Sequence, residues 1–108
     1  MERACRLFLK IADKMIIEHS TVELGKMMSS PALRYKNKVF AFYHNKEMIF
    51  RLGKEFEPEV FRLKKYSVLN TFKNRAPMYG WIEVPYVENK KWEKLAGYAL
   101  NRLVKDSR

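Results

Sequence analysis

The chain has 108 residues, 47% hydrophobic and 14% aromatic, so it suits one packed domain and argues against disorder. It carries 22 lysines and arginines against 12 acidic residues, a formal net charge of +10. Its apolar runs are too short to span a membrane, its charged N-terminus does not resemble a secretory signal, and its single cysteine excludes an internal disulfide. We therefore expect a single soluble, intracellular domain over residues 1–108 with no membrane partner.

An amphipathic helix is predicted over residues 3–19. Apolar side chains recur there at helical spacing, while Arg6, Lys10 and Lys14 fall on the opposite face. The apolar face holds Ala4, Leu7, Phe8, Ile11, Ala12 and Met15. Residues 22–28 are expected to start the sheet, and Pro31 is expected to interrupt pairing because proline cannot donate a hydrogen bond to a ladder.

Three short strands joined by two tight turns are predicted between Gly25 and Leu52. Alternating apolar and basic residues indicate a strand over 33–36, and β-branched and aromatic residues indicate strands over 39–43 and 48–52. Turns at Asn37-Lys38 and at 44–47 join them, since asparagine tolerates left-handed backbone. Such a meander is not stable alone in water, so flanking segments are expected to cover one face.

A second, shorter helix is predicted after Gly53. Proline is favoured at the first helical position, and Pro58 stands there, with Phe56, Val60 and Leu63 sharing an apolar face. A strand over 67–72 follows, and a basic turn over 73–77 then leads to the last strand.

The last strand and a closing helix complete the predicted elements. In the strand over 78–85, Ile82 and Val84 point one way and Trp81 and Glu83 the other. The helix spans about 90–105, with Asn89 as its N-cap. Its core-facing stripe holds Trp92, Leu95, Ala96, Ala99, Leu100 and Leu103.

The order of these elements predicts an α+β fold, α-β(3)-α-β(2)-α, in which an antiparallel-rich sheet is flanked by helices on one face. The chain lacks the glycine-rich turn of a βαβ nucleotide-binding unit.

Two stretches resemble the N-terminal domain of TfoX-type proteins, a family similar to the YjbR/MmcQ group. The first runs from Gly25 through the strand that ends at Leu52, and the second is Arg75-Ala76-Pro77-Met78-Tyr79-Gly80-Trp81-Ile82-Glu83-Val84-Pro85. The resemblance covers about residues 5–104. It implies the α-β(3)-α-β(2)-α layout of the type III secretion chaperone-like folds. It also implies a cytoplasmic, non-enzymatic protein, since members are described as competence-gene regulators or DNA-binding proteins.

The chain departs from this family at two positions. Ser29 and Lys38 stand where the family usually has glycine. Because only glycine allows close backbone approach without strain, a ligand held by backbone groups is not expected at these positions.

No catalytic or metal-binding constellation is present in the sequence. Cys5 has no nearby base, and His19 and His44 have no carboxylate cluster at ligand spacing. We therefore predict no enzyme, no cofactor, no catalytic residue and no metal ligand.

The basic turns are the predicted nucleic-acid-binding residues. Lysine and arginine beside turn residues suit phosphate contacts, which position a polyanion without reading its sequence. The predicted contacts are Arg34, Tyr35, Lys36, Lys38, Lys73 and Arg75. An alternative interpretation is that lysines at sheet edges only prevent aggregation.

Aromatic side chains on the strands allow two interpretations. They either form the core beneath the helices, the favoured one, or give a stacking platform for bases, with Tyr35 and Tyr43 as the exposed members. The strand aromatics are Tyr35, Phe40, Phe42, Tyr43 and Phe50. Trp81 and Trp92 either seal the core margin, again the favoured interpretation, or line a pocket between the last strand and last helix.

Two functions remain open for a binding module of this kind. One is a regulatory nucleic-acid-binding protein that uses its basic hairpin tips. The other is a protein-interaction module, chaperone-like or dimerising, that binds a protein partner or a second copy and no nucleic acid. The analogy with secretion chaperone folds slightly raises the second, although function depends on sites and not on folds. Nucleic acid is the slightly favoured partner.

Overall fold

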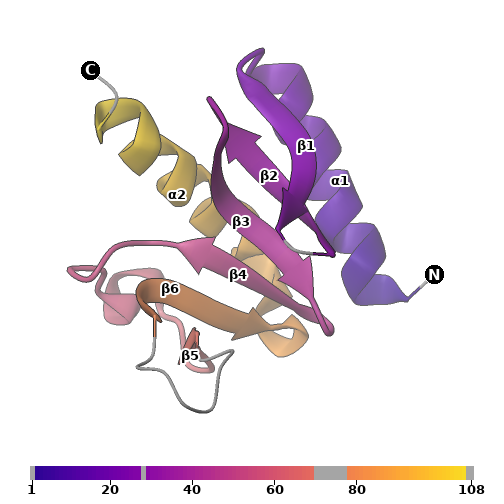
Figure 1. The fold of residues 1–108 in the computed structure, drawn as a ribbon. Coiled ribbons are helices and arrows are strands. Elements are labelled where there is room, and N and C mark those ends of the chain that lie inside the picture. The colour runs from indigo at the N-terminus through magenta and orange to yellow at the C-terminus, as the bar shows by residue number, and fades with distance from the viewer. Residues whose placement is uncertain (1, 28, 70–77, 107–108) are drawn as a thin grey trace.

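One six-stranded antiparallel sheet organises the chain, with strand order β1-β2-β3-β4-β6-β5 (Figure 1). The computed structural model describes residues 2–27, 29–69 and 78–106. The elements are α1 (Arg3–Glu18), β1 (Val22–Met27), β2 (Ser30–Tyr35), β3 (Lys38–His44), β4 (Glu47–Arg51), η1 (Pro58–Phe61), β5 (Ser67–Leu69), β6 (Met78–Pro85), η2 (Tyr86–Lys91) and α2 (Trp92–Asp106). The predicted α+β class and antiparallel sheet are confirmed.

Both α-helices pack on the same face of the sheet, behind it in the view of Figure 1. Phe8 and Ile11 of α1 and Trp92 of α2 are buried against the inward-facing strand residues Phe50 and Val84. Each helix therefore buries the apolar stripe that its sequence predicts, since burial of such a face provides most of a short helix's stability. No helix in the described part of the chain is long and apolar enough to cross a membrane.

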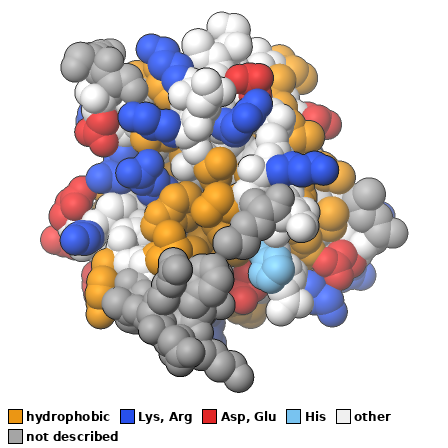
Figure 2. Space-filling model, viewed as in Figure 1, with side chains coloured by type: hydrophobic (Ala, Val, Ile, Leu, Met, Phe, Trp, Pro, Cys, Tyr) orange, Lys and Arg blue, Asp and Glu red, His pale blue; other side chains and the backbone are white. Residues whose placement is uncertain are grey.

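A second, smaller apolar cluster lies on the opposite, helix-free face of the sheet. Its members come from β1, β2, β3, β4, β5 and β6: Met27, Ala32, Val39, Phe42, Ile49, Leu69 and Trp81. Figure 2 shows hydrophobic side chains gathered at the middle of this face, with lysines and arginines around its upper part. The sheet thus carries an apolar cluster on each face.

Two-residue turns connect β2 to β3 and β3 to β4. Their central residues are Lys36 (φ 49°) and Asn37 (φ 67°) in the first, and Asn45 (φ 50°) and Lys46 (φ 67°) in the second. Positive φ at both central positions defines the type I′ turn, whose twist matches that of the flanking strands. The predicted turn at Asn37-Lys38 is shifted by one residue, because Lys38 already pairs with Tyr35.

Pro31 lies inside β2, where it pairs with Lys26 of β1. The predicted interruption of pairing at this position is therefore wrong. Pairing of β2 with β3 begins only at Ala32 with Phe42, so Pro31 has a strand neighbour on one side alone. A proline is tolerated where one side of a strand carries no ladder. β1 lies where the sheet was expected to start, over residues 22–28, so four strands precede η1 and not the three of the predicted α-β(3)-α-β(2)-α order.

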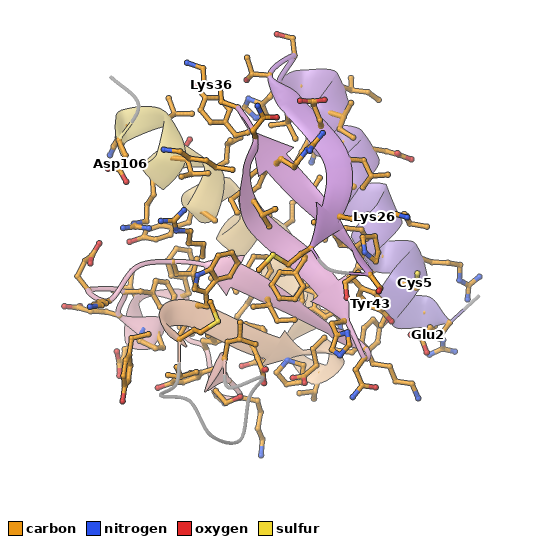
Figure 3. The ribbon with its side chains drawn as sticks, in the orientation of Figure 1. Glu2, Cys5, Lys26, Lys36, Tyr43 and Asp106 are labelled. Atoms are coloured by element: carbon orange, nitrogen blue, oxygen red, sulfur yellow. The ribbon has the colours of Figure 1, made fainter. Side chains whose placement is uncertain are left out.

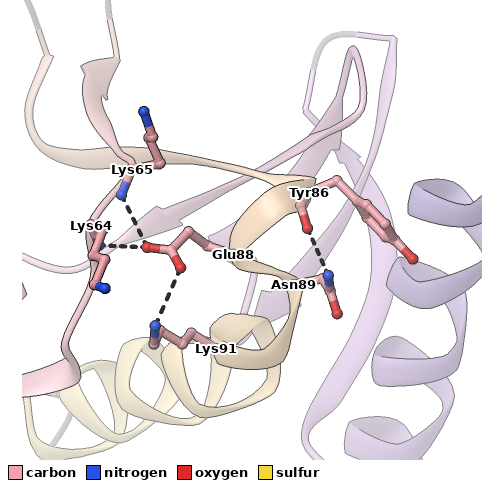
Figure 4. Close-up of polar contacts among 6 residues, drawn as sticks. All are labelled: Lys64, Lys65, Tyr86, Glu88, Asn89 and Lys91. Atoms are coloured by element: carbon pink, nitrogen blue, oxygen red, sulfur yellow. Dashed lines mark hydrogen bonds and ion pairs between the residues drawn. The ribbon is translucent and has the colours of Figure 1, made fainter.

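The predicted second α-helix is a single 3₁₀ turn, η1. Arg62 has left-handed backbone (φ 54°) and ends the turn. The N–H of Leu63 still donates to the Pro58 carbonyl at 3.0 Å, and the following N–H groups, of Lys64 and Lys65, donate to Oε2 of Glu88, the second at 3.0 Å (Figure 4). Val60, predicted to be in the core, is 72% exposed. A carboxylate distant in sequence therefore takes the donors that would have continued the helix.

The closing helix also begins differently from the prediction. The turn η2 precedes α2 and merges into it at Trp92. Asn89 does not act as an N-cap, because its side-chain amide donates to the carbonyl of Tyr86 at 2.8 Å within the turn (Figure 4).

The strand β6 has the predicted bounds, residues 78–85. β5 covers the first part of the predicted strand over 67–72, and the remainder lies outside the described residues.

Candidate nucleic-acid interface

Four of the predicted site residues lie together on the β2–β3 hairpin: Arg34, Tyr35, Lys36 and Lys38. Lys36 and Lys38 are exposed at its tip, and Figure 3 shows Lys36 at the end of the hairpin. The Lys36 Nζ lies 5.4 Å from the ring centroid of Tyr35, a cation–π contact that orders the side chain. The predicted contacts Lys73 and Arg75 lie outside the described residues.

Arg34 lies across the edge of the sheet on the helix-free face. A Cβ placed on Gly25 of β1 would come within 2.7 Å of Nε and 2.8 Å of Cδ of Arg34. The guanidinium reaches Glu23 at 3.6 Å, and Nε is buried without a hydrogen-bond partner. Gly25 thus makes room for the arginine stem, and the guanidinium is partly neutralised by Glu23. Of the three hairpin cations, Lys36 and Lys38 are the more available to an anion.

The strand aromatics do not form a stacking platform. A stacking platform was expected to expose Tyr35 and Tyr43. Each of these side chains is only 7% exposed. Both face the helices, and the rings of Phe8 and Tyr43 lie 5.8 Å apart. A register shift between Leu33 and Arg34 lets consecutive residues of β3 face the helices, so strict alternation does not hold in this hairpin.

The hydroxyl of Tyr43 donates a hydrogen bond to the carboxylate of Glu2, at the start of α1 (Figure 3). Burial of the ring disfavours the phenolate, and the neighbouring carboxylate repels it, so the pKa of Tyr43 lies well above its usual value. The contact holds the N-terminus of α1 on the sheet and makes Tyr43 a structural residue.

The two tryptophans lie on opposite faces of the sheet. Trp92, the first residue of α2, is fully buried, and its Nε1 donates to the Val84 carbonyl at 3.2 Å. Trp81 lies on the helix-free face, 5.8 Å from the ring of Phe42. A pocket between Trp81 and Trp92 is therefore ruled out, and both residues pack against core clusters as the favoured interpretation predicts.

Two exposed tyrosines that the sequence analysis missed line a cavity of about 360 Å³. Tyr66 is 43% exposed and Tyr79 is 61% exposed. The cavity lies at the β5–β6 edge of the sheet, and Lys54, Phe56 and Pro58 from the segment after β4 complete its wall. The sequence signal at this place is weak, a glycine directly after Tyr79. In the structure Gly80 has φ 94°, and the β5–β6 register shifts between Val68 and Leu69.

A small polar group lies at the other end of β3. The Oγ of Ser30 and Nδ1 of His44 are 3.1 Å apart, and His44 pairs across strands with Glu47. Partial burial, with Glu83 nearby, raises the pKa of Glu47.

Residues 2–27, 29–69 and 78–106 contain no group of three or more histidine, cysteine, aspartate or glutamate residues that could hold a metal.

No family model, no curated protein and no solved structure matches this chain. A functional assignment therefore depends on the chemistry of the surface itself.

Proposed function

We propose that this domain is a nucleic-acid-binding module that holds phosphates with the lysines of the β2–β3 hairpin. The observation that supports this most directly is the exposure of Lys36 and Lys38 at the tip of a tight turn. The ion pairs found among the described residues involve Lys14, Arg34, Lys91 and Arg102, and none includes Lys36 or Lys38.

The turn geometry supports phosphate binding because it fixes the backbone that carries both lysines. A type I′ turn fixes the backbone of Lys36, and Lys38 is the first residue of β3. Less backbone entropy is lost on binding when the segment that carries the cations is already ordered. Contacts of this kind neutralise phosphates and carry no base specificity, so we expect binding to many sequences.

The resemblance to the TfoX N-terminal domain adds support for a cytoplasmic regulatory role without catalysis. The net charge of +10 adds support for a polyanionic partner. The competing function, a protein-interaction module, predicts the opposite result in a nucleic-acid titration.

The experiment is a comparison of two triple variants with equal charge loss. The site variant is Arg34→Ala, Lys36→Ala, Lys38→Ala, and the control is Arg3→Ala, Arg6→Ala, Lys10→Ala on the exposed side of α1. Binding to a fluorescent DNA duplex and single strand is followed by anisotropy at one low salt concentration. The proposal predicts that the site variant binds at least roughly tenfold more weakly than the control. Equal weakening in both variants would contradict a site at the hairpin.

A further inference from the structure

We infer that the cavity lined by Tyr66 and Tyr79 accepts one unpaired base of a single strand. This inference rests on the proposed function and adds a base-contacting position to it. The hairpin lysines alone would hold duplex and single strand by their phosphates. A base site at the far edge of the sheet would make the domain prefer single strands.

The walls of the cavity suit a flat, aromatic ligand. Tyr66 precedes β5, Tyr79 lies in β6, and Phe56 and Pro58 come from the segment after β4. Base–aromatic stacking tolerates any base because each has a π face, so exposed tyrosines at a cavity suit this kind of ligand. The cavity, about 360 Å³, lies within the range of small-molecule sites.

Two glycines shape the bottom of the cavity. Gly53 and Gly80 both have positive φ, 90° and 94°, and the carbonyl of Gly80 accepts hydrogen bonds from the N–H groups of Leu52 and Gly53 at 2.7 and 3.0 Å. A Cβ on Gly80 would lie 3.4 Å from the backbone of Gly53. The ends of β4 and β6 therefore meet backbone to backbone, which leaves space that side chains would otherwise fill.

One basic side chain at the rim suits the phosphate that accompanies a base. Lys54 lines the cavity. The guanidinium of Arg102 and Oε1 of Glu55 lie together over Gly53, since a Cβ placed there would meet them at 2.6 and 2.7 Å. Arg102 also pairs with Glu55 at 3.1 Å and so offsets the nearest carboxylate. Glu57 and Glu59 adjoin Pro58, so we expect the phosphate beside the bound base at Lys54 and not at the Pro58 wall.

The test uses two ligands that differ only in their bases: a short fluorescent oligothymidylate and an abasic strand of the same length and charge. Binding of each is measured by anisotropy to the native protein, to Tyr66→Leu and to Tyr79→Leu. Val87→Ala, at an exposed apolar residue outside the cavity, is the control. Circular dichroism verifies that the variants fold.

The inference predicts that the native protein prefers oligothymidylate by roughly tenfold, and that either tyrosine variant removes this preference. Affinity for the abasic strand should stay the same in both tyrosine variants. Equal affinity of the native protein for the two strands would overturn the base site, as would a preference that survives in both tyrosine variants. In either case the proposed function stands if the hairpin variant still loses affinity for both strands. Failure of the native protein to bind either strand would overturn both proposals.

Discussion

At the scale of single residues, Tyr43 shows how a polar group is accommodated in the core. Its ring packs beneath α1, while its hydroxyl reaches the edge of the core and donates to Glu2. A buried hydroxyl without a partner is costly, whereas a hydrogen-bonded one contributes modestly to stability. The same environment opposes ionisation of the phenol, which gives the residue a measurable signature at high pH.

We predict that Tyr43→Phe destabilises the fold by about 1 kcal/mol at neutral pH, because Glu2 loses its donor. Since the pKa of Tyr43 is raised in the folded state, its contribution is fully present below the ordinary value of 10.0. It is lost as the pH rises above that value, because the unfolded chain ionises first. Urea unfolding from pH 8 to 11 should therefore show a steeper loss of stability for the native protein than for the variant. Parallel curves would contradict this account.

At the scale of elements, Glu88 joins two irregular segments. Its carboxylate accepts from the N–H groups of Lys64 and Lys65 and pairs with Lys91 at 3.2 Å (Figure 4). These donors lower the pKa of Glu88, the backbone N–H groups most of all. The segment after η1 is thereby tied to η2, although neither contains a regular helix.

We predict that Glu88→Gln lowers the melting temperature at neutral pH and that Glu88→Ala lowers it further, because glutamine keeps one acceptor oxygen. A carboxylate with a lowered pKa stabilises the fold above its ordinary value of 4.5. This stabilisation disappears as the pH falls through the folded-state pKa. Melting curves of the native protein and the glutamine variant should therefore converge in acid. A difference that persists at pH 2 would show that Glu88 acts through packing and not through its charge.

The β3–β4 turn gives a second prediction for an element. Lys46 has φ 67°, a conformation that a side chain makes unfavourable and that glycine adopts freely. Lys46→Gly should therefore raise the free energy of unfolding by up to about 1 kcal/mol, as Asn-Gly is a favoured type I′ pair. Lys46→Val should lower it, because a β-branched residue is strained at positive φ. Chemical denaturation measures both, and a destabilised glycine variant would contradict the assigned turn.

Local periodicity explains which elements the sequence predicts well. The apolar stripes of α1 and α2 and the alternation of Ile82 and Val84 with Trp81 recur within single segments, so each is visible without the fold. Local spacing predicts an α-helix after Pro58, where the structure has a 3₁₀ turn. The contact with Glu88 joins residues more than twenty positions apart, so no local pattern shows it. The orientation of the strand aromatics depends on the β2–β3 register shift, which no local pattern shows.

At the scale of the whole molecule, the two proposed contacts come from different parts of the sheet. The basic hairpin is a local feature, and the sequence predicts it as a site. The cavity brings together residues near positions 53–58, 66–68 and 79–82, which only the pairing of β4, β5 and β6 makes neighbours. Both lie on a chain with net charge +10, so long-range attraction would bring a polyanion to either.

The most direct measurement is the affinity for a DNA single strand titrated across salt concentration. If Lys36 and Lys38 hold phosphates, the logarithm of the association constant falls linearly with the logarithm of salt concentration. The slope should decrease in magnitude by about two in Arg34→Ala, Lys36→Ala, Lys38→Ala, because Glu23 already partly neutralises Arg34. The control variant on α1 should keep the native slope. Absence of binding at low salt, or equal slopes in all three proteins, would contradict nucleic-acid binding at this hairpin.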